Sequence, residues 1–99
     1  MTGVQTCALP ISLAASSRAA LESAFGKAAI ITPPTLQMVS EDFAYYQKEI
    51  PGFYFFVGIK NEAKKITAMW HTEFYDMDEA ALPIGVKAMA TAALDFLHR

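Results

Sequence analysis

Apolar residues recur at helical spacing in two stretches of the first half of the chain. Residues 13–29 place alanines, leucines and Phe25 on one face, which predicts a helix that ends near Gly26. Residues 40–49 predict a second helix, with Ser40 as its N-cap and Glu41 and Asp42 in its first turn, where carboxylates favour the helix dipole. The Pro-Gly pair at 51–52 ends this helix and turns the chain.

A continuously apolar stretch, residues 53–59, follows that turn. It shows no alternation of polar and apolar positions, which indicates a strand covered on both faces, as inside a parallel or mixed sheet. Residues 29–32 and 66–70 are the other strand candidates. Because so few strands make no complete sheet, we expect the rest of the sheet to come from residues outside this sequence.

The last third of the chain predicts one long helix over residues 78–98. Asp76 and Glu79 have the spacing of a capping pair, with the Asp76 side chain bonding an amide of the first turn. Pro83 removes one backbone donor and is expected to bend the helix. Apolar residues fill nearly all of its circumference beside one narrow polar stripe, so we expect this helix to be buried within a layered domain.

Composition narrows the classes of function. The chain has 99 residues, 54% of them hydrophobic, with a mean hydropathy of +0.25, so part of its apolar surface is expected to face a partner or a missing part of the protein. The net charge of −2 makes nucleic acid an unfavourable partner. No apolar run approaches the roughly 18 residues of a membrane helix, and the cytoplasm is the favoured compartment. A single cysteine excludes an internal disulfide framework.

Residues 1–11 resemble the translation of a common sequencing adapter, with GTG taken as the start codon. A signal peptide is the weaker interpretation, because the segment has no basic start and Pro10 splits its apolar part. We therefore treat residues 1–11 as a non-native segment, leave them out of the fold prediction, and expect Cys7 to carry no function. The same interpretation implies that the natural reading frame begins further upstream.

The best candidate for chemistry is His71, one of two histidines in the chain, which lies between a predicted strand and an acidic helix start. A histidine held at a fixed point suits a metal site or a general base. On residue chemistry alone, His71 is more simply interpreted as a loop histidine without a chemical role than as a metal ligand or general base. His98, near the end of the last helix, is interpreted as favouring the helix dipole.

Three blocks of the sequence, taken in order, resemble the C-terminal end of the two-metal amidohydrolase and metallopeptidase family that includes aminoacylases, hippurate hydrolases and carboxypeptidases. The blocks are Ser-Glu-Asp-Phe at 40–43, Ile-Pro-Gly-Phe-Tyr-Phe-Phe-Val-Gly at 50–58, and His-Thr at 71–72 followed by 74–85. The similarity is to the hippurate hydrolase-like branch. Glu73 departs from the pattern, because relatives commonly carry proline there.

The resemblance implies an α/β fold, a mixed sheet with flanking helices, of which residues 12–99 form the C-terminal part of the catalytic domain. It implies that His71 is a ligand to one of two divalent metal ions, zinc or manganese. It also implies that the general base and the remaining ligands lie upstream. Glu41 and Asp42 would support the metal ligands or line the substrate pocket.

Two functions follow as alternatives. The first is a metal-dependent amidohydrolase acting on small N-acyl amino acids or related amides, present as a C-terminal fragment and inactive without the missing N-terminal part. Homo-oligomerisation of the complete protein stays open. The second is a small non-enzymatic interaction module that binds a partner through exposed apolar faces.

Overall fold

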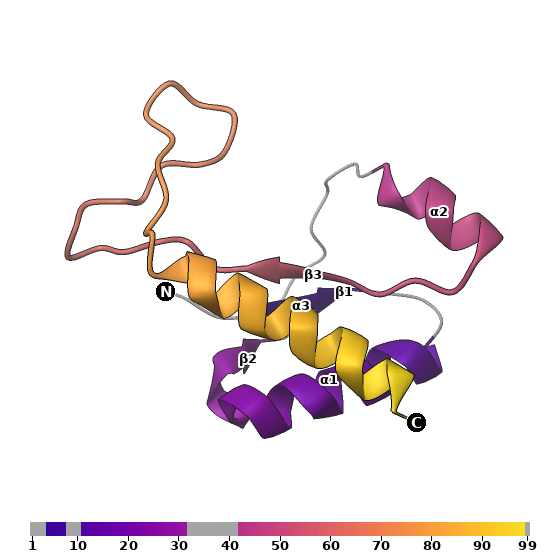
Figure 1. Cartoon of the computed structure of the whole chain (residues 1–99). Helices are drawn as coiled ribbons and strands as arrows, with labels where there is room; N and C mark the ends of the chain where they lie inside the picture. Colours follow the sequence, from indigo (N-terminus) through magenta and orange to yellow (C-terminus); the bar gives the residue numbers. More distant parts are fainter. Residues whose placement is uncertain (1–3, 8–10, 32–41, 99) are drawn as a thin grey trace.

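The computed structural model describes residues 4–7, 11–31 and 42–98. Its elements follow in the order β1 (Val4–Cys7), α1 (Ile11–Phe25), a 3-10 turn (Lys27–Ala29), β2 (Ile30–Ile31), α2 (Phe43–Glu49), β3 (Tyr54–Val57) and α3 (Ala81–Leu97). Figure 1 shows α1 and α3 beside a small sheet, with α2 and a long loop before α3 extending away from it. No helix in these ranges is long and apolar enough to span a membrane.

The sheet is mixed, as expected, with strand order β2-β1-β3. β1 pairs in parallel with β2, from Val4 opposite Ile30, and antiparallel with β3, from Val4 opposite Val57. The strand at Val4–Cys7 was not expected, because residues 1–11 were left out of the fold prediction. The interpretation of these residues as adapter-derived stays a prediction.

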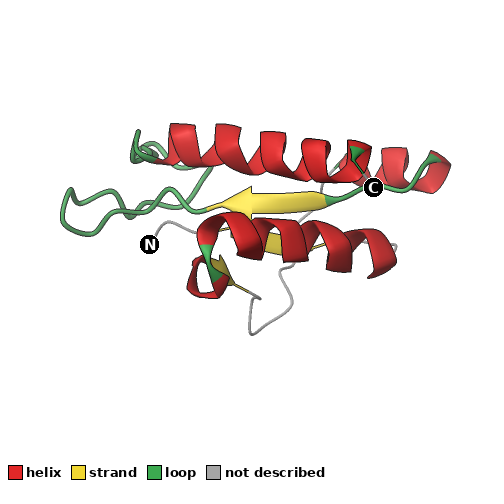
Figure 2. Cartoon of the chain, turned by 60° about the horizontal axis from the view of Figure 1, so that its bottom comes forward, coloured by secondary structure: helices red, strands yellow, loops and turns green. Residues whose placement is uncertain are grey.

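A small apolar core joins the two long helices to one face of the sheet. Leu21 of α1, Ile30 of β2 and Ala88 of α3 are buried together, and Phe53 and Phe55 pack against them. Side chains alternate along a strand, so Phe53 and Phe55 point to the same face of β3. Figure 2 shows α1 and α3 flanking β3, which fits this helix-and-sheet layering.

The long last helix, α3, begins later than predicted and is less buried. The structure starts it at Ala81, not 78, and its N-cap Ala80 makes no side-chain cap hydrogen bond. The predicted capping pair is therefore wrong: the Asp76 carboxylate accepts from the Met77 N–H outside the helix. Pro83 is the third helical residue, where a backbone N–H has no partner within the helix, so its missing donor removes no helical hydrogen bond.

The burial expected for α3 is also corrected. Within the helix, Ala81 and Ala88 are its buried residues, and these small side chains allow close approach to α1 and β3. The large apolar residues of α3 are mostly exposed: Leu82, Val86, Met89, Leu94, Phe96 and Leu97. The reason is size, because one neighbouring helix and a short sheet cannot surround a helix of this length.

Helix α2 begins later than the sequence predicts. The structure begins the helix at Phe43 with Asp42 as N-cap, and Asp42 makes no side-chain cap hydrogen bond. Ser40 and Glu41 lie outside the described residues. The predicted stop is confirmed at Ile50, and the Gln47 side-chain amide donates to the Gly52 carbonyl at 3.1 Å. A Cβ at Gly52 would lie 2.9 Å from the Gln47 Cγ, so a larger residue in this turn would have to displace the Gln47 or Phe43 side chain.

The third strand candidate, residues 66–70, is not a strand. Ile66 makes one isolated bridge with Asn61, and the chain beyond it has no regular secondary structure until α3. Lys65 closes the turn between them with a left-handed backbone, φ 59°. The segment has no neighbouring strand to extend the pairing, and an unpaired extended segment gains no ladder hydrogen bonds.

Candidate functional site

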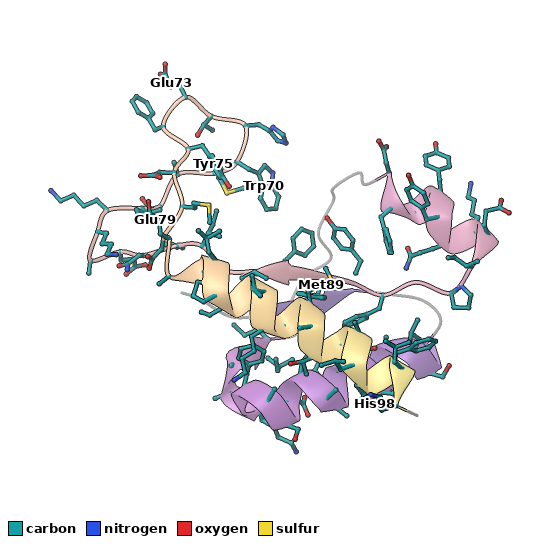
Figure 3. The ribbon with its side chains drawn as sticks, in the orientation of Figure 1. Trp70, Glu73, Tyr75, Glu79, Met89 and His98 are labelled. Atoms are coloured by element: carbon teal, nitrogen blue, oxygen red, sulfur yellow. The ribbon has the colours of Figure 1, made fainter. Side chains whose placement is uncertain are left out.

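His71 lies in the loop of residues 67–77, which we call the His71 loop and which joins the Asn61–Ile66 bridge to the start of α3. Figure 3 shows this loop standing clear of the helices, with Glu73 at its outer end. The His71 side chain is exposed, and its backbone is left-handed with φ 63°. Such a backbone costs a non-glycine residue roughly 1–3 kcal/mol and persists only where the surrounding structure enforces it.

Short contacts on either side enforce the turn at His71. The Thr72 hydroxyl donates to the Met69 carbonyl at 2.7 Å, across His71. The Tyr75 N–H donates to the Thr72 carbonyl at 3.1 Å, which closes the next turn. The preceding Trp70 ring stacks on the Phe56 ring of β3, with centroids 6.1 Å apart and planes at 19°. The loop is therefore a folded structure that rests on β3 through Trp70.

The ring of Trp70 is the end of an aromatic row along the face of β3 opposite the core. Tyr54 and Phe56, which point to this face, meet edge to face at 5.3 Å. Tyr54 in turn lies 5.4 Å from the Phe43 ring of α2. The row thus runs from Phe43 to Trp70. Nothing in the sequence pattern predicted it, because the order of contacts depends on how α2 and the loop fold back over the strand.

The residues predicted to form the site occupy opposite ends of this row. Asp42 directly precedes Phe43 at the start of α2 and is exposed, whereas His71 directly follows Trp70. Figures 1 and 2 both show α2 and the His71 loop at the two ends of β3. The structure therefore does not bring Asp42 and His71 together, although both border one face of the sheet. Glu41 lies outside the described residues.

The base of the loop contains a buried carboxylate, Asp78, which from the sequence was interpreted only as one of several acids near the start of the helix. Asp78 is 4% exposed, and its Oδ2 accepts from the Asn61 side-chain amide at 2.7 Å. Its Oδ1 accepts from the Ala80 N–H at 3.2 Å and from the Lys64 ammonium at 3.3 Å. An aspartate just before a helix is the one sequence signal that favoured it, but the partner 17 positions earlier comes only from the fold.

These contacts also set the acidity of Asp78. The Asn61 amide hydrogen bond, with the Ala80 N–H and the nearby Lys64 ammonium, holds the pKa of the Asp78 carboxyl below its ordinary value. Burial acts in the opposite direction and raises the pKa, but the hydrogen bonds outweigh it. The carboxylate is therefore charged at neutral pH and serves as an acceptor for three donors.

The arrangement of possible metal ligands decides whether these residues can hold a metal ion. Among residues 4–7, 11–31 and 42–98, no group of three or more His, Cys, Asp or Glu side chains is placed to hold a metal ion. A catalytic metal usually needs about three protein ligands. The described residues therefore form no complete metal centre.

Comparison with known proteins relates the chain to a family of hydrolases. IAA-amino acid hydrolase ILR1-like 5 of Arabidopsis thaliana is 43% identical over 60 residues, which is 61% of this chain and 14% of that protein. Thermostable carboxypeptidase 2 of Saccharolobus solfataricus is 35% identical over 60 residues, 61% of this chain and 15% of that protein. The same identity and coverage hold for putative amidohydrolase YhaA of Bacillus subtilis.

The chain thus spans about one seventh of the length of these relatives. No solved structure matches it significantly. The sequence model of peptidase family M20/M25/M40 matches residues 6–95, a range that contains all of β3, the His71 loop and nearly all of α3. With nine tenths of its residues matched, the chain belongs to peptidase family M20/M25/M40.

Proposed function

We propose that residues 12–99 form the C-terminal part of a metal-dependent amidohydrolase that acts on N-acyl amino acids or related amides. The observation that carries the proposal is the family match across the His71 loop. The relatives are named as an IAA-amino acid hydrolase, a carboxypeptidase and an amidohydrolase, and these names support an amide-cleaving activity. The match favours this function over a non-enzymatic interaction module.

His71 is proposed as the one metal ligand of this chain. The left-handed backbone at His71 is flanked by the Thr72 hydroxyl bond to Met69 and by the stacked Trp70, so the backbone that carries the exposed imidazole is held in place. Two divalent ions, zinc or manganese, would lower the pKa of a shared water and polarise the amide carbonyl. The other ligands and the general base belong to residues upstream of this sequence, in the missing N-terminal part.

Glu41 and Asp42 are proposed to support the substrate side of the site. The exposed position of Asp42 at the end of the aromatic row agrees with a place at the edge of a pocket that other residues complete. The two acids are proposed to bind substrate or to orient ligands, because Asp42 belongs to no group of three or more potential metal ligands among the described residues.

The test is to recover the DNA upstream of this reading frame and express the longer protein. We expect an in-frame extension with further His, Asp, Glu and Cys residues, and hydrolysis of N-acyl amino acids that requires zinc or manganese. His71→Ala should lower kcat/KM by a factor of roughly 100 or more and reduce bound metal. His98→Ala, at the other histidine, should leave both unchanged.

A ribosome-binding site directly before residue 12 would overturn the proposal, as would a His71→Ala variant with full activity and metal content. The 99-residue chain itself offers a second test. We expect it to bind zinc weakly and to hydrolyse no amide. Tight stoichiometric zinc, measured by elemental analysis, would show that the missing ligands have been placed in the wrong part of the protein.

A further inference from the structure

The ends of the His71 loop are joined to each other through one residue, Asn61. Its main chain pairs with Ile66, where the loop begins: the Asn61 N–H donates to the Ile66 carbonyl at 2.9 Å, and the Ile66 N–H donates back at 2.8 Å. Its side-chain amide donates to Asp78, where the loop ends. The Asp78 N–H also donates to the Ile59 carbonyl at 2.9 Å. The loop therefore closes on itself before α3 begins.

The orientation of the Asn61 amide is fixed by its two partners. The Asn61 Oδ1 accepts from the Lys64 N–H at 3.2 Å, so its Nδ2 is left to donate to Asp78. An amide in the opposite orientation would place its oxygen against the Asp78 carboxylate and its nitrogen against an N–H donor. A carboxylate at position 78 and an amide at position 61 are thus complementary.

Because Asp78 is buried, its carboxylate depends on this contact for compensation of its charge. An ionised carboxylate removed from water is costly unless hydrogen bonds and a countercharge compensate it. Asp78 has all of them: the Asn61 amide, the Ala80 N–H and the Lys64 ammonium. Loss of one donor leaves the buried carboxylate less compensated and weakens the side-chain contact between Asn61 and Asp78.

We propose that Asp78 is a positioning residue for His71: its carboxylate joins Asn61 and Lys64 to Ala80, the N-cap of α3, and so fixes the loop that carries the imidazole. The inference rests on the proposed role of His71 as a ligand. Asp78 itself touches no reacting group. It acts through the loop, so a change at Asp78 displaces His71 and Trp70 together and leaves the helices folded.

Trp70 reports on the loop without any metal. It is the single tryptophan of the chain, it directly precedes His71, and its stacked ring is 45% exposed. In the 99-residue chain, Asp78→Asn should shift the Trp70 emission to longer wavelength. Full exposure of a ring now 45% exposed should raise its acrylamide quenching constant by roughly twofold. The helical circular dichroism signal should stay unchanged.

Asp76→Asn is the matched control. It makes the same change of charge two residues away, and among the described residues its carboxylate accepts from the Met77 N–H alone, in an exposed part of the loop. We expect its Trp70 emission and quenching to match the unsubstituted chain. Equal effects of the two substitutions, or no effect of Asp78→Asn, would overturn the proposal.

Exchange of the Asn61 and Asp78 side chains distinguishes loss of this contact from a general loss of stability. In the double variant Asn61→Asp with Asp78→Asn, the amide introduced at position 78 can donate to the carboxylate introduced at position 61. The Lys64 N–H and the Ala80 N–H keep oxygen acceptors. We expect the double variant to recover most of the Trp70 shielding that Asp78→Asn loses. A double variant no better than the single one would contradict the proposed contact.

Two milder substitutions test the proposal if the Asp78→Asn variant fails to fold. Lys64→Met removes the ammonium that contacts Asp78, and Lys65→Met removes the neighbouring exposed one. Lys64→Met should raise Trp70 quenching more than Lys65→Met, and equal quenching would overturn the proposal. These outcomes do not depend on metal, so they fail separately from the zinc and activity tests of His71.

Discussion

Two regions of this molecule are held in place by different forces. The layer of α1, α3 and the sheet depends on apolar packing around Leu21 and Ala88, with a partly buried Phe55. The segment from Asn61 to Ala80 depends on hydrogen bonds to a buried carboxylate and on one stacked ring. Packing is non-directional, whereas hydrogen bonds fix distances and angles. The region that carries the candidate ligand is therefore the one with directional contacts.

The largest expected effect comes from a substitution in the packed layer of α1, α3 and the sheet. Leu21→Ala removes a fully buried side chain and should lower the free energy of unfolding by roughly 2–5 kcal/mol, measured by urea denaturation. Leu82→Ala is the control with the same chemistry, because Leu82 on α3 is 57% exposed and should cost less than about 1 kcal/mol. Equal costs would show that α3 is covered in solution by something that this arrangement lacks.

A smaller effect is expected where the two regions meet, at Phe56. Phe56→Ala removes the ring contacts with Trp70 and Tyr54, and each aromatic pair contributes about 0.5–1.5 kcal/mol. Trp70 emission should shift to longer wavelength and thermal unfolding should begin earlier. Phe74→Ala, at a 77% exposed ring of the same loop, should change neither. A Phe74→Ala variant that moves the Trp70 emission as far would show that the loop rests on a different ring.

The smallest expected effect is confined to the loop and appears in acid. The pKa of Asp78 is lowered in the folded chain, so its charged form stabilises the fold at every pH above the ordinary carboxyl pKa. This contribution is lost as the pH falls through the lowered folded value. Trp70 quenching should therefore rise in that acid range in the unsubstituted chain and show no such step in Asp78→Asn. An acid step that persists in the variant would assign the titration to another group.

The sequence was sufficient for features that depend on neighbouring residues. Gly26 ends α1 with a left-handed backbone of φ 87°, and the Pro-Gly pair ends α2, both as the local pattern predicts. The mixed sheet with flanking helices is confirmed in coarse form, and the resemblance to the hydrolase family is confirmed by the family match.

Features that depend on distant partners escaped prediction. The sequence predicted Asp76 as the capping residue, because its spacing from Glu79 fits a local motif. In the structure the Asp76 carboxylate accepts from the Met77 N–H, and Asp78 accepts a hydrogen bond from Asn61 in an earlier turn. The apolar surface of α3 indicated burial, but burial requires neighbours that the described residues do not supply. His71 was expected at the end of a strand and lies instead in a loop, and its role as a ligand stays a prediction.

The closure of the loop depends on the amide form of Asn61. Hydrolysis of this amide to a carboxylate changes neither the length nor the shape of the side chain, yet it replaces a donor by an acceptor facing Asp78. Two carboxylates then oppose each other at the closure of the loop, and like charges at contact distance repel. Chains that carry an aspartate at position 61 should therefore have a less shielded Trp70 than the unsubstituted chain.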